Sequence, residues 1–374
     1  MMKVYTQTWY RGNNYGSVLQ AYALQHTISD MGYACSVLNY KPTKADMWKL
    51  KFINHSLKET IQYKINEYLM KKNGASEAVN NLSLFDDFRA QHMQITPPCS
   101  TAPEIARICG DDAVFVCGSD QIWNTDFSWD KQPDYPFFLD FVPDDRKKIA
   151  YSSSFGEVHM STEVKQKVRK LLERYDAIAV RENSGKNLVE DMGLSAKVVL
   201  DPTMLCDRTV WDELAASRLL KQDYVLLFQI NPNKELLHFA EEFARSQKMN
   251  LVILSANPAH KKFLGRKAIY LPKVEEWLSY FKYASYVLTD SFHACVFSVQ
   301  FERQFAPVVD QRNTKRISSV LELLDVKKRI VEVNDLHALP GVLKSTIHYD
   351  DVKQKLKGLQ KDSGEWLLNK LETD

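Results

Sequence analysis

Short apolar runs alternate with stretches of helical apolar spacing along most of the chain. In the first half, the runs predict strands at residues 3–8, 34–39, 112–117, 148–153, 177–180 and 197–200. The stretches between them predict helices at 17–31, 161–175 and 182–192. Such alternation is typical of βαβ units, whose parallel strands are joined by right-handed crossovers.

A second series of the same kind begins after Asp201-Pro202-Thr203, where the first pattern stops. Its strands are predicted at 224–229, 251–254, 286–289 and 305–309, and its helices at 234–247, 274–283 and 292–301. We therefore expect an α/β protein in which two doubly wound, Rossmann-like domains face a cleft. The expected division is 1–204 and 205–349, followed by an amphipathic C-terminal helix over 350–374.

Residues 41–98 interrupt the first series with a lysine-rich helical pattern, which we interpret as an insertion in the first domain. Its lysines interleave with Trp48, Leu50 and Phe52, a pattern compatible with lying on an anionic membrane surface. A solvated helix face is the commoner explanation of such a pattern. A peripheral contact with the inner face of the membrane therefore stays open as one interpretation of this segment.

Composition narrows the class of protein. A chain of 374 residues exceeds the size at which one core usually keeps growing, which also favours two domains. The net charge of only +2 argues against nucleic acid as a partner. The six cysteines lack C-x-x-C spacing and mostly lie in apolar runs, which predicts buried, reduced thiols. With a strand-like N-terminus and no long uncharged apolar run, the expected location is cytoplasmic.

Polar residues at strand ends are the candidates for chemistry, because ligands of open α/β sheets collect beyond the carboxyl ends of the strands. After the first strand, Gly16 would let backbone approach a ligand closely, and Ser17 opens a helix. The Asn-Tyr-Gly sequence around Gly16 is also ordinary turn chemistry, and the two explanations are about equally good.

The third strand ends in a segment that suits a sugar. Its polar side chains and its indole are Ser119, Asp120, Gln121, Trp123 and Asn124. Sugar rings stack on indole faces while their hydroxyls bind amides and carboxylates, so we favour an acceptor-binding role for this set. The alternative is that Trp123 fills a gap in the core and Asp120 caps the next turn.

Two cationic candidates follow later strands. Arg181 leaves a short apolar strand and could form bidentate bonds to phosphate or carboxylate, although an ion pair with Glu182 or Asp201 explains it equally well. His293 lies in the first turn of a predicted helix, beside Asp290 and Ser291. Backbone N–H groups and the helix dipole favour an anion there, and an imidazole can pass it a proton. No pair of the other histidines has zinc-ligand spacing, so no metal is expected.

Five segments resemble, in order, the motifs of the polysaccharide pyruvyl transferase family. They are NYGSVLQAYALQ at 14–25, GSDQIWN at 118–124, VRENS at 180–184, LDPT at 200–203 and DSFH at 290–293. The resemblance runs from about residue 5 to about residue 325, without the insertion and the terminal helix. It implies a fold like that of GT-B glycosyltransferases. It also implies that phosphoenolpyruvate gives its pyruvyl group to a hexose of a polysaccharide, or of its lipid-linked precursor, as a cyclic ketal with release of phosphate. No cofactor is implied.

The resemblance places the family's histidine on His293 and its arginine on Arg181. Many members carry another arginine two residues before the histidine, where this chain has Ser291. The task of holding the donor then passes to Arg181, Arg316 or Lys315, or the donor differs.

The resulting hypothesis assigns catalysis to His293 and Arg181, with His293 as the acid/base. The donor-binding set comprises Gly16, Ser17, Asp290, Ser291 and Arg316, and the acceptor-binding set is the one that follows the third strand. One rival is a GT-B-type glycosyltransferase that uses a nucleotide sugar, since fold does not fix function. Another is a non-catalytic carbohydrate-binding protein that lost the donor site.

Overall fold

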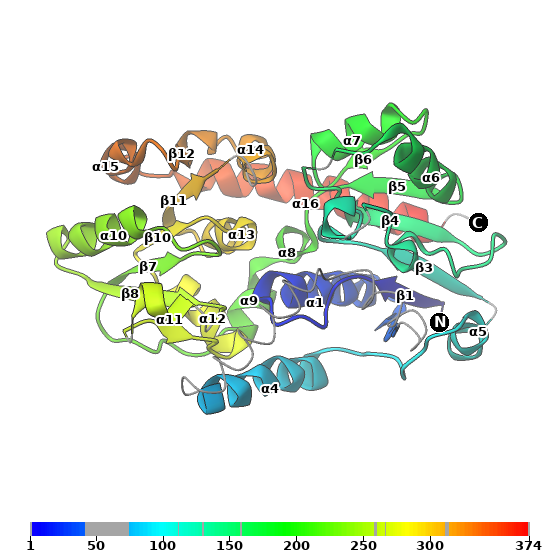
Figure 1. Cartoon of the computed structure of the whole chain (residues 1–374), viewed down its shortest axis with the longest axis horizontal. Coiled ribbons are helices and arrows are strands. Elements are labelled where there is room, and N and C mark those ends of the chain that lie inside the picture. Colours follow the sequence, from blue (N-terminus) through cyan, green and yellow to red (C-terminus); the bar gives the residue numbers. More distant parts are fainter. Residues whose placement is uncertain are drawn as a thin grey trace, which may run out of the picture.

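The structure is a computed structural model, and it describes residues 2–41, 75–110, 112–128, 131–157, 159–257, 260–265, 267–310 and 314–372. Its described part contains two six-stranded parallel sheets that lie side by side (Figure 1). Each sheet carries helices on its faces, which confirms the expected pair of doubly wound domains. The lysine-rich residues at 44–58, on which the membrane interpretation rests, lie outside the described residues.

The first sheet has the order β2-β1-β3-β4-β5-β6. Its strands are β1 (Lys3–Gln7), β2 (Ala34–Val37), β3 (Ala113–Cys117), β4 (Lys148–Ser153), β5 (Ala177–Val180) and β6 (Lys197–Val198). All of them were predicted, because each buried strand is an apolar or β-branched run between turn residues. The strand order reverses between β1 and β3, so a crevice for ligands is expected at the carboxyl ends of these two strands.

The second sheet has the order β12-β11-β10-β7-β8-β9 and reverses between β7 and β10. Its strands are β7 (Tyr224–Phe228), β8 (Asn250–Ser255), β9 (Ile269–Tyr270), β10 (Tyr286–Thr289), β11 (Gln304–Val309) and β12 (Val331–Glu332). The sequence predicts four of these and misses β9 and β12. Each missed strand has two residues and lies at an edge of the sheet, where a strand is too short to show an alternating pattern. The equally short edge strand β6 was predicted because its apolar run continues through Val199 and Leu200.

The helices of the first half include two that the pattern did not reveal, α5 and α8. The helices are α1 (Tyr15–Asp30), α4 (Ala75–His92), α5 (Ala102–Cys109), α6 (Thr162–Leu172), α7 (Asn183–Glu190) and α8 (Pro202–Leu205). Helix α5 has a full capping box, in which Thr101 and Glu104 cap each other's backbone N–H groups. Ser161 caps α6 as predicted, with its hydroxyl accepting from Val164 N. Helix α4 is the described end of the expected insertion.

The second half contains α9 (Arg208–Leu214), α10 (Lys234–Ser246), α11 (Lys261–Leu264), α12 (Val274–Lys282), α13 (Phe292–Gln300), α14 (Thr314–Leu323), α15 (Leu339–Lys344) and α16 (Tyr349–Glu372). Short 3-10 turns η1 (Thr125–Phe127), η2 (Tyr135–Phe138), η4 (Lys327–Arg329) and η5 (Leu336–Ala338) complete the described elements. Within the described ranges, no helix is both long and apolar enough to cross a bilayer.

One hydrophobic core joins the two halves. It contains Tyr15 and Val18 of α1 together with Trp277 of α12 and Phe292 of α13. The rings of Tyr15 and Trp277 stack with centroids 5.1 Å apart, and the Tyr15 hydroxyl donates to Pro272 O at 2.6 Å. The carboxyl ends of β1 and β10 are thereby held next to each other, because α1 and α13 begin just after these strands.

The terminal helix α16 straps the two halves together, and in Figure 1 it runs along both of them in red. Its first turns bury Val352 and Leu356 in the shared core, and its last turns bury Leu367 and Leu371 against the first sheet. In its middle, the Ser363 hydroxyl accepts from Leu200 N at 3.1 Å. The strap therefore fixes the segment at which the chain passes from one half to the other.

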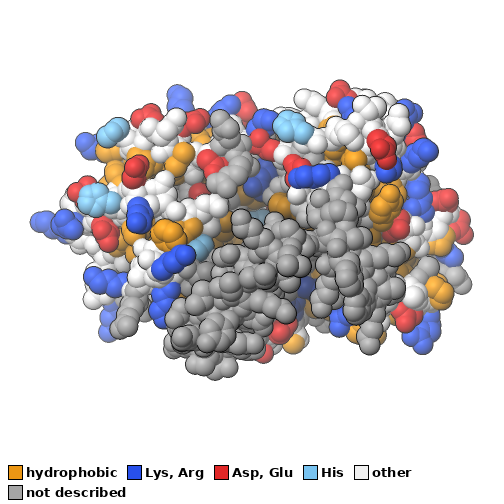
Figure 2. All heavy atoms as spheres, viewed as in Figure 1, with side chains coloured by type: hydrophobic (Ala, Val, Ile, Leu, Met, Phe, Trp, Pro, Cys, Tyr) orange, Lys and Arg blue, Asp and Glu red, His pale blue; other side chains and the backbone are white. Residues whose placement is uncertain are grey.

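The cysteines and the surface agree with the composition. All six cysteines are free and buried, as the sequence predicts. On the described surface visible in Figure 2, Lys and Arg side chains are interspersed with Asp and Glu side chains. Among the described residues of this face, no broad basic surface of the kind that binds a nucleic acid backbone is visible.

Shortening an apolar side chain of the strap should destabilise the whole chain. We expect Leu367→Ala, at a side chain that is 0% exposed, to lower the free energy of unfolding by about 2–5 kcal/mol. The matched control is Lys361→Ala, at an exposed position of α16, which should change it by less than about 0.5 kcal/mol. Urea unfolding curves measure both, and coinciding curves for the two variants would contradict the role of the strap.

Candidate active site

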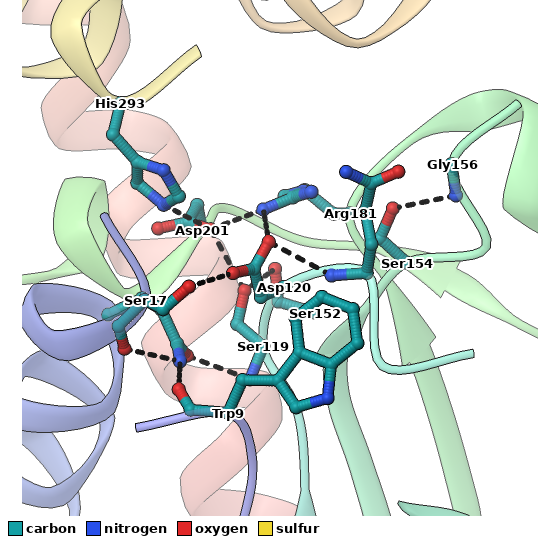
Figure 3. A network of polar contacts seen from close by, with 12 residues as sticks. Trp9, Ser17, Ser119, Asp120, Ser152, Ser154, Gly156, Arg181, Asp201 and His293 are labelled. Carbon is teal, nitrogen blue, oxygen red and sulfur yellow. Dashed lines mark hydrogen bonds and ion pairs between the residues drawn. The ribbon is translucent and has the colours of Figure 1, made fainter. Parts of the chain in front are cut away.

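The candidate site lies where the reversal points of the two sheets meet. Segments after β1, β3 and β5 bring Ser17, Asp120 and Arg181 from the first half, and the segment after β10 brings His293 from the second. Figure 3 shows these side chains converging, with His293 pointing from α13 toward Asp201. Residues that are far apart in the sequence are therefore assembled by the two strand reversals.

The side chain of His293, from the second half, reaches the first half because Gly16 leaves room for it. A Cβ atom on Gly16 would lie 2.1 Å from Nδ1 of His293, so only a glycine allows the imidazole to rest on the first turn of α1. Ser291 caps α13, with its hydroxyl accepting from Ala294 N at 3.4 Å. The histidine is thus fixed in the first turn of its helix, as the sequence predicts.

The surroundings of His293 are polar and closed. Its side chain is only 12% exposed, and its Nε2 atom lies 3.9 Å from Oδ2 of Asp201. Burial lowers the pKa of the imidazole, and the nearby Arg181 and Arg316 act in the same direction, whereas Asp201 and Asp120 oppose the shift. The ring is therefore neutral at neutral pH and is able to accept a proton.

Arg181 lies beneath His293 among carboxylates. Its Nη1 donates to Oδ2 of Asp201 at 3.1 Å and lies 3.7 Å from Oδ1 of Asp120. Burial acts to lower the pKa of the guanidinium, but Asp201, Asp120 and Glu182 outweigh it and the pKa is raised. The ion pair with Asp201, which sequence reasoning left open as an alternative, is present.

The other edge of the Arg181 guanidinium is free among the described residues. Its Nε and Nη2 atoms are buried and have no hydrogen-bond partner, although Oε2 of Glu182 lies 3.6 Å from Nε. The Phe292 ring of the second half covers the face of the group, 4.5 Å from Cζ. One end of the guanidinium is anchored, and the edge that suits a bidentate oxyanion is left without a partner.

Unpartnered polar atoms collect at this site. Within the described chain, buried atoms without a hydrogen-bond partner include Nε2 of His293, Nε of Arg316 and Oε2 of Glu182, besides the edge of Arg181. Such atoms are rare in folded proteins, and a group of them in one place needs an explanation. A ligand rich in oxygen would supply the missing partners.

Asp120 anchors the first half of the site. Its Oδ2 accepts from the Ser17 hydroxyl at 2.7 Å, and its Oδ1 accepts from Gln121 N at 2.9 Å. The backbone of Asp120 is left-handed, with φ of 72°, which turns the carboxylate inward. Gly118 permits this turn, because a Cβ there would lie 2.0 Å from the Tyr151 carbonyl oxygen.

Arg316 enters the site from α14, whereas Lys315 does not. Burial lowers the pKa of Arg316, and Asp120 and Glu182 are among the charges that act on it. Lys315 is exposed, and its Nζ lies 3.5 Å from Oε2 of Glu157 at the rim. Of the three cations considered as substitutes at the donor site, the structure brings Arg181 and Arg316 together and leaves Lys315 outside.

Two of the predicted acceptor residues do not face a ligand. Trp123 is 1% exposed, stacks on Phe138 at 5.3 Å and donates its indole N–H to Phe137 O, so it offers no free face to a sugar. The alternative explanation, a ring that fills the core, is the correct one. Ser119 is also fully buried, and its hydroxyl donates to Asp201 at 2.8 Å.

Gln121 and Asn124 remain at the surface of the site. The Asn124 amide donates to Oε1 of Gln121 at 3.0 Å, and the pair rests against Gly156. Asp290, assigned to the donor, is instead a structural anchor. Its carboxylate accepts from Ile230 N at 2.6 Å and from Asn231 N at 2.8 Å, and its negative charge is unsuited to an anion.

A small cavity of about 40 Å³ lies beside the imidazole. It is lined by Asn13, Asn14, Tyr15, Gly16, Phe228, Ile230, Ala256, Trp277, Ser291 and His293. This volume holds a few water molecules at most. Among the residues with described positions, no three His, Cys, Asp or Glu side chains gather in a way that could hold a metal ion.

A model of the polysaccharide pyruvyl transferase family matches residues 14–311, which include every side chain that converges at the site except Arg316. The chain belongs to this family. No curated protein sequence matches it.

Solved structures show the same fold at low identity. A putative UDP-N-acetylglucosamine 2-epimerase from Listeria monocytogenes is 9% identical, with 100% of this chain and 98% of that chain covered and a TM-score of 0.56. The UDP-GlcNAc 2-epimerase from Neisseria meningitidis bound to UDP-GlcNAc is 9% identical, with 99% of each chain covered and a TM-score of 0.50. These similarities confirm the expected GT-B-like fold of this pyruvyl transferase family member.

The sequence analysis considered Asp201 and Glu182 only as structural ion-pair partners of Arg181, and the structure places both in the site. Both belong to segments that resemble family motifs, and both follow apolar strands. Their position after the strands β6 and β5 was the available signal. Burial raises the pKa of Glu182, whereas Asp201, despite its burial, has its pKa lowered by His293, Arg181 and the hydrogen bonds from Thr203.

A side chain at position 16 should displace the imidazole. We expect Gly16→Ala to cost about 1–3 kcal/mol of stability through overpacking and to shift the NMR resonances of the His293 ring. Gly12→Ala is the matched control, because a Cβ at Gly12 meets no atom within 4 Å. Urea unfolding and histidine-selective NMR test both variants, and unchanged His293 resonances in Gly16→Ala would disprove the contact.

Proposed function

We propose that this protein transfers the pyruvyl group of phosphoenolpyruvate to a hexose of a polysaccharide or of its lipid-linked precursor. The product is a cyclic ketal, and inorganic phosphate leaves. The observation that carries the proposal is the partnerless edge of the buried Arg181 guanidinium, close to a neutral imidazole, in a member of this family. Phosphoenolpyruvate carries a carboxylate and a phosphate, and either oxyanion fits a bidentate guanidinium edge.

The donor needs more than one cation, and Arg316 supplies the second. It reaches the site from the second half, as the arginine that many family members carry at the position of Ser291 would do. The N-terminus of α1 adds a positive dipole end beside Gly16, while Ser17 serves the site indirectly, because its hydroxyl donates to Asp120 and its N–H to Oδ1 of Asn14. Three carboxylates, Asp120, Asp201 and Glu182, lie beside these groups, and burial raises the pKa of Glu182, which lessens the negative charge that an anionic donor meets.

Ketal formation requires proton transfers that a neutral imidazole can serve. The methylene carbon of the donor gains one proton, and two sugar hydroxyls each lose one as their oxygens bond to the adjacent carbon. The carbon–oxygen bond to phosphate breaks, its electron pair stays with the phosphate, and the second proton leaves with it. His293 begins neutral, so its first role is to accept a hydroxyl proton. Gln121 and Asn124 orient the acceptor at the rim.

The direct test is incubation with phosphoenolpyruvate and a panel of free and lipid-linked hexosides. We expect phosphate release together with a pyruvyl ketal detected by mass spectrometry. Calorimetric titration with phosphoenolpyruvate and with UDP-N-acetylglucosamine separates this reaction from nucleotide-sugar transfer. Binding of the nucleotide sugar alone would overturn the proposal in favour of a glycosyltransferase, and binding without any turnover would favour a carbohydrate-binding protein.

Removing the imidazole should abolish most of the activity without unfolding the chain. We expect His293→Gln to lower the rate at least about a hundredfold, the scale of a lost general base. His238→Gln, on the exposed face of α10, is the matched control and should keep the wild-type rate. Phosphate-release assays measure both rates, and a His293→Gln variant of wild-type activity would remove this residue from the mechanism.

Replacing the planar guanidinium of Arg181 by the ammonium group of a lysine should weaken donor binding. Arg181→Lys keeps the charge but loses the bidentate edge, so we expect a loss of about 1.5–3 kcal/mol, or about tenfold to a hundredfold in donor affinity. Arg208→Lys, in a partly exposed ion pair on α9, serves as the control. Calorimetry with phosphoenolpyruvate decides the matter, and equal affinities for the two variants would show that Arg181 does not hold the donor.

A further inference from the structure

Asp201 makes several contacts within the site, and its two carboxylate oxygens contact different groups. The side chain is 0% exposed and lies at the point where β6 gives way to α8. Oδ1 caps α8, accepting from Thr203 N at 3.0 Å and from the Thr203 hydroxyl at 2.6 Å. Oδ2 accepts from the Ser119 hydroxyl at 2.8 Å and from Nη1 of Arg181 at 3.1 Å, and it lies 3.9 Å from Nε2 of His293.

A second aspartate in the chain shows what the cap alone requires. Asp207 precedes α9 in the same Asp-x-Thr arrangement, and its Oδ1 accepts from Thr209 N at 2.9 Å and from the Thr209 hydroxyl at 2.8 Å. Capping therefore needs only one oxygen of the carboxylate. The contacts of Asp201 Oδ2 with the arginine and the histidine exceed anything that the helix needs.

The position of Oδ2 matters most when the imidazole holds a proton. Four charged groups act on the imidazole of His293. Asp201 and Asp120 raise its pKa, and Arg181 and Arg316 lower it. Burial and the two arginines disfavour an imidazolium. Asp201 is the largest of the opposing effects, and its carboxylate is the one that forms an ion pair with the ring when the ring is charged.

We propose that Asp201 is a positioning residue of the transfer reaction, whose Oδ2 atom stabilises the proton taken up by His293 and fixes the guanidinium of Arg181. The role in turnover rests on the proposed function. When a sugar hydroxyl attacks, its oxygen–hydrogen bond breaks, its electron pair forms the new oxygen–carbon bond, and the proton moves to the imidazole. The positive charge then appears next to Oδ2, which is already in place and needs no rearrangement.

The same oxygen sets the orientation of the donor site. Because Oδ2 anchors Nη1, the Nε and Nη2 edge of Arg181 is held in one direction and stays free for an oxyanion. Ser119, which does not face a ligand, finds its role here, since its hydroxyl fixes Oδ2 from the far side. One carboxylate oxygen thus couples the proton acceptor from the second half to the anion-binding group of the first half.

The test compares Asp201→Asn with Asp207→Asn as a matched pair, because both variants replace a capping carboxylate by an amide that caps about equally well, and only one removes the charge beside His293. Histidine-selective NMR follows the titration of the His293 ring, which is assigned from the resonance missing in His293→Gln. We expect the titration midpoint of His293 to fall in Asp201→Asn, since an imidazolium there loses its counter-charge, and to stay at the wild-type value in Asp207→Asn.

The pH profile of kcat/KM gives the second readout. Its acid limb reports the proton on the free enzyme's base, so it should move to lower pH in Asp201→Asn, and kcat should fall about tenfold to a hundredfold. A His293 midpoint that is the same in wild type and Asp201→Asn would overturn the inference. So would equal losses of kcat in the two variants, because they would reduce Asp201 to a helix cap.

The inference stays testable if Asp201→Asn does not fold and if the wild type shows no activity. If Asp201→Asn does not fold, Asp201→Glu and Asp207→Glu replace the pair, since a longer side chain cannot cap α8 and keep its other oxygen in place. An unchanged His293 midpoint and an unchanged kcat in Asp201→Glu would then sink the inference. If the wild type releases no phosphate from phosphoenolpyruvate, the proposed reaction is wrong, yet the NMR titration still decides whether Asp201 acts on His293.

Discussion

The contact of His293 with the first half of the molecule is the interaction on which the site depends. An imidazole from α13 rests on the backbone at Gly16 and faces Asp201 at 3.9 Å. Neither half holds the whole cluster, because the imidazole comes from one half and the guanidinium of Arg181 from the other. The apolar core around Tyr15 and Trp277 and the strap α16 keep the two halves in register at this point. The packing between the two halves therefore determines both the stability of the chain and the geometry of the site.

Unpartnered polar atoms distinguish this buried cluster from a structural ion pair alone. Burying ions costs more than their attraction returns unless hydrogen bonds satisfy the remaining atoms. Here Asp201 is fully satisfied, while Arg181, Arg316, His293 and Glu182 each keep an unpartnered buried atom among the described residues. A structural network of the same size would gain by closing these bonds internally. The unpartnered N–H groups of Arg181 and Arg316 suit the oxygens of an anionic ligand, whereas Oε2 of Glu182 can only accept, as from a ligand hydroxyl.

Much of the fold and about half of the site could be predicted from the sequence. The features that were predicted are those that leave a pattern in the local sequence, and the features that were missed depend on three-dimensional contacts. Buried parallel strands announce themselves as apolar runs, so all six strands of the first sheet were found, whereas the two-residue strands β9 and β12 carry no periodicity. Polar residues just after strand ends are candidates for a ligand site, and this rule identified Asp120, Arg181 and His293. The same rule could not distinguish an indole that faces a ligand from one that faces the core. Trp123 therefore looked like a sugar platform, although its ring packs between Phe138 and Phe155. Asp201 was considered only as an ion-pair partner of Arg181, because Asp-Pro-Thr was interpreted as the end of the first series. The contact of its second oxygen with His293 appears only in three dimensions.

Ser291 shows how a changed residue can leave the chemistry of a site intact. As an N-cap, it secures the first turn of α13, and with it the position of His293, by accepting from Ala294 N. Many family members carry an arginine at this position, whereas here a cation of the second half comes from the neighbouring helix. Helix α14 packs against α13 and carries Arg316, on which the charges of Asp120 and Glu182 act. Ser291 thus holds the histidine in place, and the guanidinium is attached one helix further along the chain.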